Sequence, residues 1–296
     1  MATTHRRRRV ALRAAGAAAL VAVTGCSGGG AEAPVRPGAT TSPSTTGSGA
    51  GEPAGPAPKP SSTATAARDD QYTFPEKALP SSKTEALAFV RSVTITADGF
   101  GAGFRRADPY EGDPTRWSVL GRDCLWRREP LPPHVRASLT REFVKPGAGG
   151  KEAARVKVTV TVHESVTAAD RDMAVSLETS MRCPEQRLST TERIRKLWSR
   201  GDSHGGMRAA ISDDDLNETG EYTSGNGVWN GFSWYKYRLG PITLSVTARS
   251  GGGETEAEEA ETTTGVASGI GLVGADIDRR GAQRGKQLDD KGAGDE

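Results

Sequence analysis

The chain has 296 residues, of which 35% are hydrophobic and 26% are charged, and its 39 basic and 37 acidic residues give a net charge of +2. Residues 1–25 contain five Arg and no acidic residue, so the rest of the chain carries 34 basic and 37 acidic side chains, a net charge of −3. This balance excludes nucleic acid as a partner, because nucleic-acid-binding surfaces need clustered basic side chains.

Residues 1–25 have the layout of a lipoprotein signal peptide. Four arginines, Arg6–Arg9, precede an apolar segment from Val10 to Val23, which is shorter than the roughly 20 residues that a membrane-spanning helix needs. The last residue of this segment begins the run Val23-Thr24-Gly25-Cys26, which is typical of a bacterial lipobox. We therefore expect lipidation of Cys26, which would anchor the protein to the extracytoplasmic face of the cell membrane. Both the general secretory route and the twin-arginine route stay open, and the alternative for Cys26 is a free thiol.

Residues 26–71 are rich in Pro, Gly, Ser and Thr, and no large apolar side chain occurs between Val35 and Tyr72. Such a segment cannot bury enough surface to offset its ordering entropy, so a disordered linker is predicted. Residues 72–278 are predicted to form one folded domain. Residues 279–296 lack apolar periodicity and are predicted to be a disordered tail.

The clearest predicted strand is Arg155–His163, in which Val alternates with polar residues, as expected of a strand with one buried face. A helix follows from about Thr167 to Met181. Its residues at four-residue steps predict one apolar stripe, formed by Ala169, Met173, Leu177 and Met181.

Four further strands and a final helix are predicted downstream. The strands are Arg193–Ser199, Gly220–Ser224, Gly231–Arg238 and Ile242–Arg249, the last two joined by the turn Leu239-Gly240-Pro241. The helix begins near Thr255, and four glycines weaken its continuation. Its predicted apolar positions are Ala257, Ala260, Val266, Ala267, Ile270 and Val273. The fold class is therefore α+β, a single domain with a twisted antiparallel sheet and packed helices.

Cys124 and Cys183 are the two cysteines downstream of Cys26. In an exported domain an even pair is most simply a disulfide. A closed loop of about 60 residues would stabilise the fold by about 4 kcal/mol. Two free thiols or a metal pair are the alternatives, and no neighbouring His supports a metal.

No catalytic residue, metal or cofactor is predicted. Asp213–Glu218 fails the pattern of a calcium loop, so a solvated loop is favoured. His163 lies on the polar face of its strand and is expected to be exposed. Asp202, Ser203 and His204 are adjacent, which is poor geometry for a catalytic triad. A hydrolase with an unrecognised site around them stays open as an alternative.

A glycine-rich segment between residues 99 and 103 lacks the spacing of a dinucleotide-binding loop. A flexible turn anchored by Phe100 and Phe104 is predicted there instead.

Aromatic residues give the one indication of a binding site. The predicted strand Gly231–Arg238 places Phe232 and Trp234 on one face and Tyr235 and Tyr237 on the other, so both faces need cover. Packing in the core is one interpretation, and an aromatic-lined cleft is the other. The candidate ligand-binding residues are Trp229, Trp234, Tyr235 and Tyr237.

The segment from Leu87 to Gly274 resembles the extracellular sensor domain of PknH-type receptor kinases and the actinobacterial lipoproteins that share it. The match is an order of elements: a Trp–Cys segment (Trp117 to Trp126), a Val-rich strand, a helix ending at Cys183, a Trp-Tyr strand, an apolar strand and a closing helix. The resemblance implies an α+β fold with a cleft for an unidentified envelope ligand. That family uses two disulfides, whereas one is possible here, and this chain carries no kinase, so signalling would need a partner.

These observations predict a non-enzymatic, lipid-anchored domain that binds a ligand or protein partner in the cell envelope. A structural envelope lipoprotein is the remaining alternative.

Overall fold

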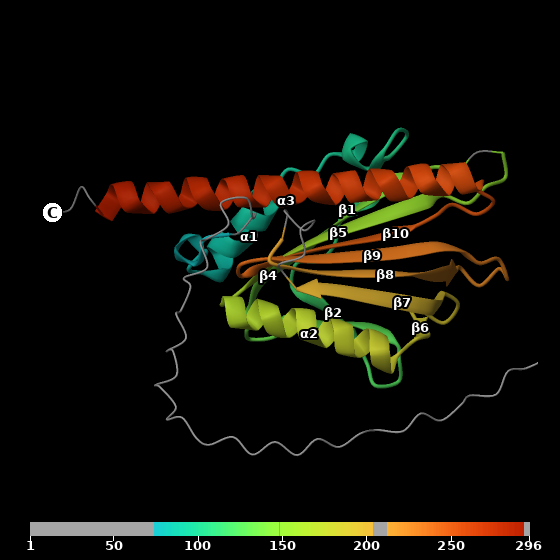
Figure 1. Cartoon of the computed structure of the whole chain (residues 1–296), viewed down its shortest axis with the longest axis horizontal. Coiled ribbons are helices and arrows are strands. Elements are labelled where there is room, and N and C mark those ends of the chain that lie inside the picture. The colour runs from blue at the N-terminus through green and yellow to red at the C-terminus, as the bar shows by residue number, and fades with distance from the viewer. Residues whose placement is uncertain (1–73, 148, 204–211, 293–296) are drawn as a thin grey trace, which may run out of the picture. The chain divides into compact units, whose positions relative to one another are not determined.

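The chain folds around one large antiparallel sheet (Figure 1). The computed structural model describes residues 74–147, 149–203 and 212–292. In these ranges eight strands form a sheet in the order β1-β4-β5-β10-β9-β8-β7-β6, with all neighbours antiparallel. They are β1 (Arg105–Glu111), β4 (Val135–Lys145), β5 (Ala154–His163), β6 (Gln186–Arg187), β7 (Arg193–Ser203), β8 (Asp214–Thr223), β9 (Asn230–Leu239) and β10 (Ile242–Arg249).

The other described elements cover this sheet. Strands β2 (Arg116–Leu120) and β3 (Trp126–Pro130) form a separate hairpin. The α-helices are α1 (Lys83–Ser92), α2 (Val166–Arg182) and α3 (Glu256–Gly292), and the short 3-10 helices are η1 (Glu76–Ala78) and η2 (Ala97–Phe100). The predicted single-domain α+β fold with an antiparallel sheet is confirmed.

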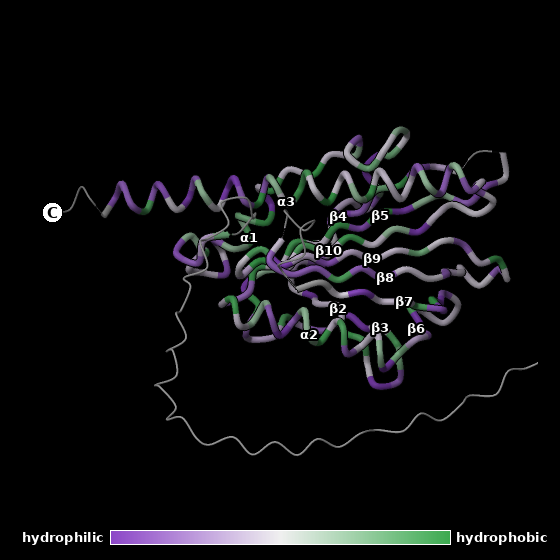
Figure 2. Tube along the Cα trace, viewed as in Figure 1, coloured by the Kyte–Doolittle hydropathy of each residue, from purple (hydrophilic) through white to green (hydrophobic). Residues whose placement is uncertain are grey.

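One face of the sheet carries the apolar core. The four alternating valines of β5 are at most 1% exposed, and Ile242, Leu244 and Val246 of β10 are fully buried beside them. They pack in one cluster with side chains of α1 and α3. The alternation is visible along the central strands in Figure 2. The strand predicted at Arg155–His163 and the predicted β9–β10 hairpin are therefore confirmed.

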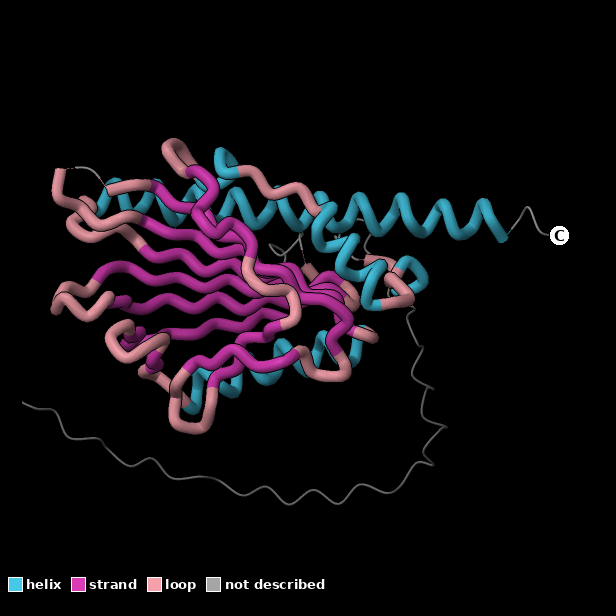
Figure 3. Tube along the Cα trace, turned by 180° about the vertical axis from the view of Figure 1, so that it is seen from behind, coloured by secondary structure: helices cyan, strands magenta, loops and turns pink. Residues whose placement is uncertain are grey.

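Helix α3 extends much further than predicted. The prediction of a disordered tail is wrong for residues 279–292, which continue α3 past the end of the sheet (Figure 3). A Cβ on Gly281 would lie 2.6 Å from the ring of Phe74, so the bare glycine lets this ring pack against the helix. The Arg284 guanidinium also pairs with the Glu85 carboxylate of α1 at 2.7 Å. These contacts with N-terminal elements, which are remote in sequence, hold the extension on the domain.

Two glycines in the first half of α3 allow close packing against η2. A Cβ on Gly265 would lie 2.3 Å from the backbone oxygen of Phe100, and one on Gly269 would lie 2.4 Å from its ring. Phe100 is 1% exposed, so the predicted anchor at the end of η2 is buried. Helix α3 is capped at the N-terminus predicted near Thr255, because Thr255 Oγ1 accepts a hydrogen bond from the Glu258 amide. Of the six predicted apolar positions, Val266, Ile270 and Val273 are buried, whereas Ala257, Ala260 and Ala267 are exposed.

The acidic run Asp213–Glu218 is not a solvated loop. From Asp214 onward it belongs to β8, and Arg238 of β9 pairs with Asp213 at 3.0 Å and with Asp214 at 2.5 Å. Asp has a low β-propensity, but the positive charge of Arg238 on the neighbouring strand compensates the negative charge of Asp214 and stabilises it in β8.

The predicted signal peptide (1–25), Cys26, the linker (26–71) and the domain start at residue 72 lie outside the described residues. No helix in the described ranges is long and apolar enough to cross a membrane.

Candidate functional site

The second face of the sheet is covered by α2 and the β2–β3 hairpin, which a disulfide joins. The Cys124 and Cys183 sulfurs are bonded, with 5.6 Å between the Cα atoms, so the predicted disulfide is confirmed. The Arg187 amide, just beyond α2, donates a hydrogen bond of 2.8 Å to the Cys124 carbonyl oxygen. The hairpin and the end of α2 therefore form one connected wall over the sheet.

The side of α2 that faces the sheet is polar. Ser176, Thr179 and Ser180 are buried there, whereas Leu177 is 39% exposed and Met181 is 77% exposed. The predicted apolar stripe of α2 is thus wrong, apart from buried Ala169. The reason is that the facing strands present Thr, Ser, Lys and His side chains, which require polar partners when they are covered.

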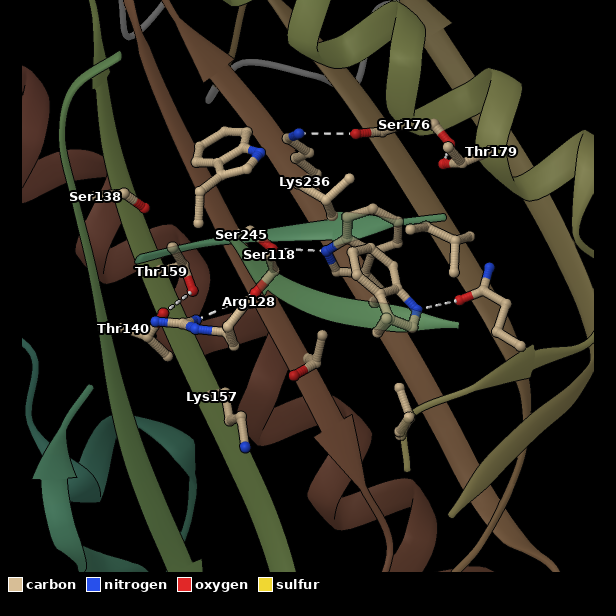
Figure 4. Close-up of a pocket in the computed structure, with 18 of the residues that line it drawn as sticks. Ser118, Arg128, Ser138, Thr140, Lys157, Thr159, Ser176, Thr179, Lys236 and Ser245 are labelled. Atoms are coloured by element: carbon tan, nitrogen blue, oxygen red, sulfur yellow. Dashed lines mark hydrogen bonds between the residues drawn. The ribbon is translucent and has the colours of Figure 1, made fainter. Parts of the chain in front are cut away.

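A cavity of about 450 Å³ lies between this face of the sheet and the wall. Its volume is within the range of about 300–1,000 Å³ that is typical of small-molecule sites. The hairpin contributes Trp117 and Trp126, β9 contributes Trp234, and the strands below contribute a row of hydroxyl groups (Figure 4). The hydroxyl-bearing residues on the sheet are Ser138, Thr140, Thr159, Thr161, Thr243, Ser245 and Thr247.

A buried ionic network holds α2 on the sheet at one end of the cavity. The Lys236 ammonium lies 2.7 Å from the Asp172 carboxylate and donates a hydrogen bond of 2.7 Å to Ser176 Oγ. Thr243 Oγ1 lies 3.0 Å from His163 Nε2 and donates a hydrogen bond of 3.2 Å to Asp172. Burial acts to raise the pKa of Asp172, but Lys236 and His163 outweigh it and hold this pKa well below its usual range.

His163 is fully buried, so the expectation that it is exposed is wrong. Its ring packs edge-on against Trp117, with 6.3 Å between the ring centroids, because the polar face of β5 is covered by the hairpin and α2. Its Nδ1 atom has no hydrogen-bond partner among the described residues.

Glu218 of β8 is a second buried carboxyl in the cavity lining. It is 1% exposed and accepts a hydrogen bond of 3.1 Å from Ser199 Oγ. Burial raises the pKa of Glu218 to about 7, against the opposing effects of Ser199 and Lys236. At neutral pH a large fraction of this side chain therefore carries a proton and can donate a hydrogen bond.

Of the four candidate ligand-binding residues, Trp234 is the one that lines this cavity. Tyr235 and Tyr237 lie on the opposite face of β9, half-buried against the apolar core. Trp229 precedes β9, and the Arg195 guanidinium stacks on its ring at 3.6 Å. The requirement that both aromatic faces of β9 be covered is met by helices on one side and by the wall on the other.

Sequence reasoning missed most of the polar lining, including Lys236, Asp172 and Glu218. The signal that could have found Lys236 is its alternation with Trp234 and Phe232, which places all three on one face of β9. Glu218 lies directly opposite Trp234 in the register of β8 and β9, and a sequence gives no such register.

The stretch predicted as an alternative catalytic site is Asp202 to His204. Asp202 and Ser203 end β7, and His204 lies outside the described residues. No group of three or more His, Cys, Asp and Glu side chains in the described part of the chain is placed to hold a metal ion.

No protein-family model matches this chain, and no curated protein sequence matches it. The resemblance to PknH-type sensor domains therefore stays a prediction.

Proposed function

We propose that this chain is a lipid-anchored protein of the cell envelope whose folded domain binds a small ligand or a partner and catalyses no reaction. The observation that supports this most is the cavity between the sheet and the wall. It is of small-molecule size, and its walls carry Trp117, Trp126 and Trp234. A purely structural lipoprotein has no need of such a cavity, because a covered sheet face is most stable when it is packed without voids.

The polar lining also favours binding over packing. Buried Lys, Asp and Glu side chains cost folding free energy compared with apolar residues of similar volume. Their presence beside an aromatic-walled space is typical of binding sites, in which a few placed polar groups orient a ligand.

Native mass spectrometry of the full chain, extracted from its own membrane, tests the binding function. We expect a bound small molecule in the wild type and its loss in Trp234→Ala, while Trp198→Ala keeps it, because Trp198 is 61% exposed and lies outside the cavity lining. An empty wild-type protein, with no partner captured by crosslinking, would contradict the proposal.

The anchor is tested separately. Lipidation at Cys26 predicts that Cys26→Ser leaves the protein in the soluble extracellular fraction, and that the wild-type N-terminal peptide carries acyl chains by mass spectrometry. A membrane-bound Cys26→Ser protein with an unmodified wild-type Cys26 would contradict this part.

A further inference from the structure

The floor of the cavity is a continuous set of hydroxyl groups. Ser138 and Thr161 lie 3.0 Å apart through their hydroxyl oxygens, and Thr140 and Thr159 lie 2.8 Å apart. These pairs cross from β4 to β5, and Ser245 and Thr247 continue the row on β10. Each hydroxyl both donates and accepts hydrogen bonds, so this floor matches a ligand that itself carries several hydroxyl groups.

The walls present the faces and edges of indole rings. Trp126 Nε1 donates to Gln186 Oε1 at 2.7 Å, and Trp234 Nε1 donates to Ser245 Oγ at 2.6 Å. Because both ring N–H groups already have protein partners, these rings offer a ligand their π surfaces. The negative face of an aromatic ring attracts positively polarised groups such as the C–H bonds of a sugar ring.

The rim carries an excess of positive charge. Six Lys and Arg residues line the cavity against three acidic residues, Asp172, Glu192 and Glu218. Within the described ranges no ion pair includes two of these six cations, Arg116 and Arg128, whose charges act on the Asp113 carboxylate from beyond ion-pair distance and help to lower its pKa.

Arg128 is the better placed of the two. Its guanidinium is held by Ser118 Oγ at 3.2 Å and by the backbone oxygen of Asp113 at 3.1 Å. Figure 4 shows it reaching from the hairpin towards Thr140 and Thr159, on the same side of the cavity as Lys157. A guanidinium fixed in this way can bind a carboxylate or phosphate through charge-assisted hydrogen bonds, which are stronger than neutral ones.

We infer that the cavity binds an anionic ring polyol, a sugar or inositol ring that carries a phosphate or carboxylate group. In this arrangement the sugar hydroxyls contact the Thr and Ser floor, the ring packs on the indoles, and Arg128 binds the anionic group. This inference rests on the proposed binding function and specifies its ligand class. The same chemistry is offered by a soluble sugar phosphate and by a phosphate-linked polyol on a lipid.

Isothermal titration calorimetry on the full chain in detergent tests the inference with four probes: glucose 1-phosphate, glucuronate, glucose and inorganic phosphate. We expect the two anionic sugars to bind at least about tenfold more tightly than glucose or phosphate, since each of these lacks one of the two kinds of contact. Binding to phosphatidylinositol vesicles, with phosphatidylcholine vesicles as the control, would identify a lipid as the source. Binding to either source supports the inference.

Two variants locate the contacts. Arg128→Gln should weaken the binding of glucose 1-phosphate at least about tenfold and leave the binding of glucose unchanged. The matched control is Arg122→Gln, because Arg122 is exposed on the same hairpin and lies outside the cavity lining. Thr159→Val keeps the strand and removes one floor hydroxyl, so it should weaken the binding of all three sugars and leave the binding of inorganic phosphate unchanged. This second variant keeps the test decisive if Arg128→Gln loosens the hairpin.

Failure of the inference and failure of the proposed function give different results. A neutral or apolar molecule that occupies the cavity, and is displaced by none of the anionic sugars, overturns the ligand class and leaves the binding function standing. A protein that is empty when extracted from its own membrane and binds no probe overturns both.

Discussion

The buried carboxyl of Glu218 makes the stability of this domain depend on pH in an unusual direction. Most carboxylates in folded proteins have lowered pKa values and stabilise the fold as pH rises. Burial instead raises the pKa of Glu218 from its ordinary 4.5 to about 7. A raised acid pKa means that the folded state holds the proton more tightly than the unfolded state, so this contribution is fully present below about pH 4.5 and is lost as pH rises through 7.

The difference between 4.5 and about 7 sets the size of the effect. At about 1.36 kcal/mol per pKa unit it corresponds to about 3 kcal/mol of unfolding free energy by pH 8. Glu218→Gln keeps the shape and removes the titration. We therefore expect the variant to be similar to the wild type at pH 5 and up to about 3 kcal/mol more stable than the wild type at pH 8.

Urea unfolding followed by tryptophan fluorescence measures this between pH 5 and 8. With a slope of about 1–3 kcal/mol per molar urea, the two midpoints at pH 8 should differ by about 1 M or more. Exposed Glu164 provides the matched control, since Glu164→Gln should follow the wild-type curve throughout. Parallel pH curves for the wild type and Glu218→Gln would refute the reasoning.

Three further predictions concern the wall and the helices. Lys236→Met should destabilise the fold by about 3–5 kcal/mol in urea unfolding because it leaves Asp172 buried without its cation. Adding Asp172→Asn should recover most of this loss. A Lys236→Met variant as stable as the wild type would contradict the stabilising role of this ion pair. Reduction of the disulfide should lower the unfolding free energy by about 4 kcal/mol, measured in urea with and without thiol, and equal midpoints would refute it. Gly265→Ala should lower the melting temperature because its Cβ would meet the Phe100 carbonyl oxygen at 2.3 Å. The Cβ of Gly271→Ala would meet nothing within 4 Å, so this variant should be more stable by about 1 kcal/mol and melt at a higher temperature. Melting temperatures that shift in the same direction in both variants would count against this packing.

The elements with strong alternation could be predicted from the sequence, and those held by tertiary contacts could not. Strand β5 and the β9–β10 hairpin repeat apolar residues at every second position, which specifies both strand and face. Asp213 and Asp214 have no such signal, because their place beside β9 depends on the ion pairs with Arg238. The last turns of α3 were missed for the same reason, since Gly281 packs on a phenylalanine ring from the other end of the domain.

The candidate site was predictable in part. Trp234 and the disulfide partners followed from residue type and from the predicted export signal. The wall could not be predicted in this way. A hydrophobic pattern predicts that a helix buries its apolar side, whereas α2 buries its polar side. That inversion becomes predictable only when the facing strands are known to carry hydroxyl groups and a lysine.

The two faces of the sheet therefore have different physical roles. The face under α1 and α3 is packed with apolar side chains and supplies the hydrophobic driving force of folding. The face under α2 and the hairpin buries charges and a cavity, both of which oppose folding. The Cys124–Cys183 disulfide joins the two parts of the wall, and the Lys236–Asp172 pair ties the wall to the sheet, so that together they offset this cost. A wall held by a few strong links, rather than by close apolar packing, leaves space beneath it, and this space is what a binding function requires.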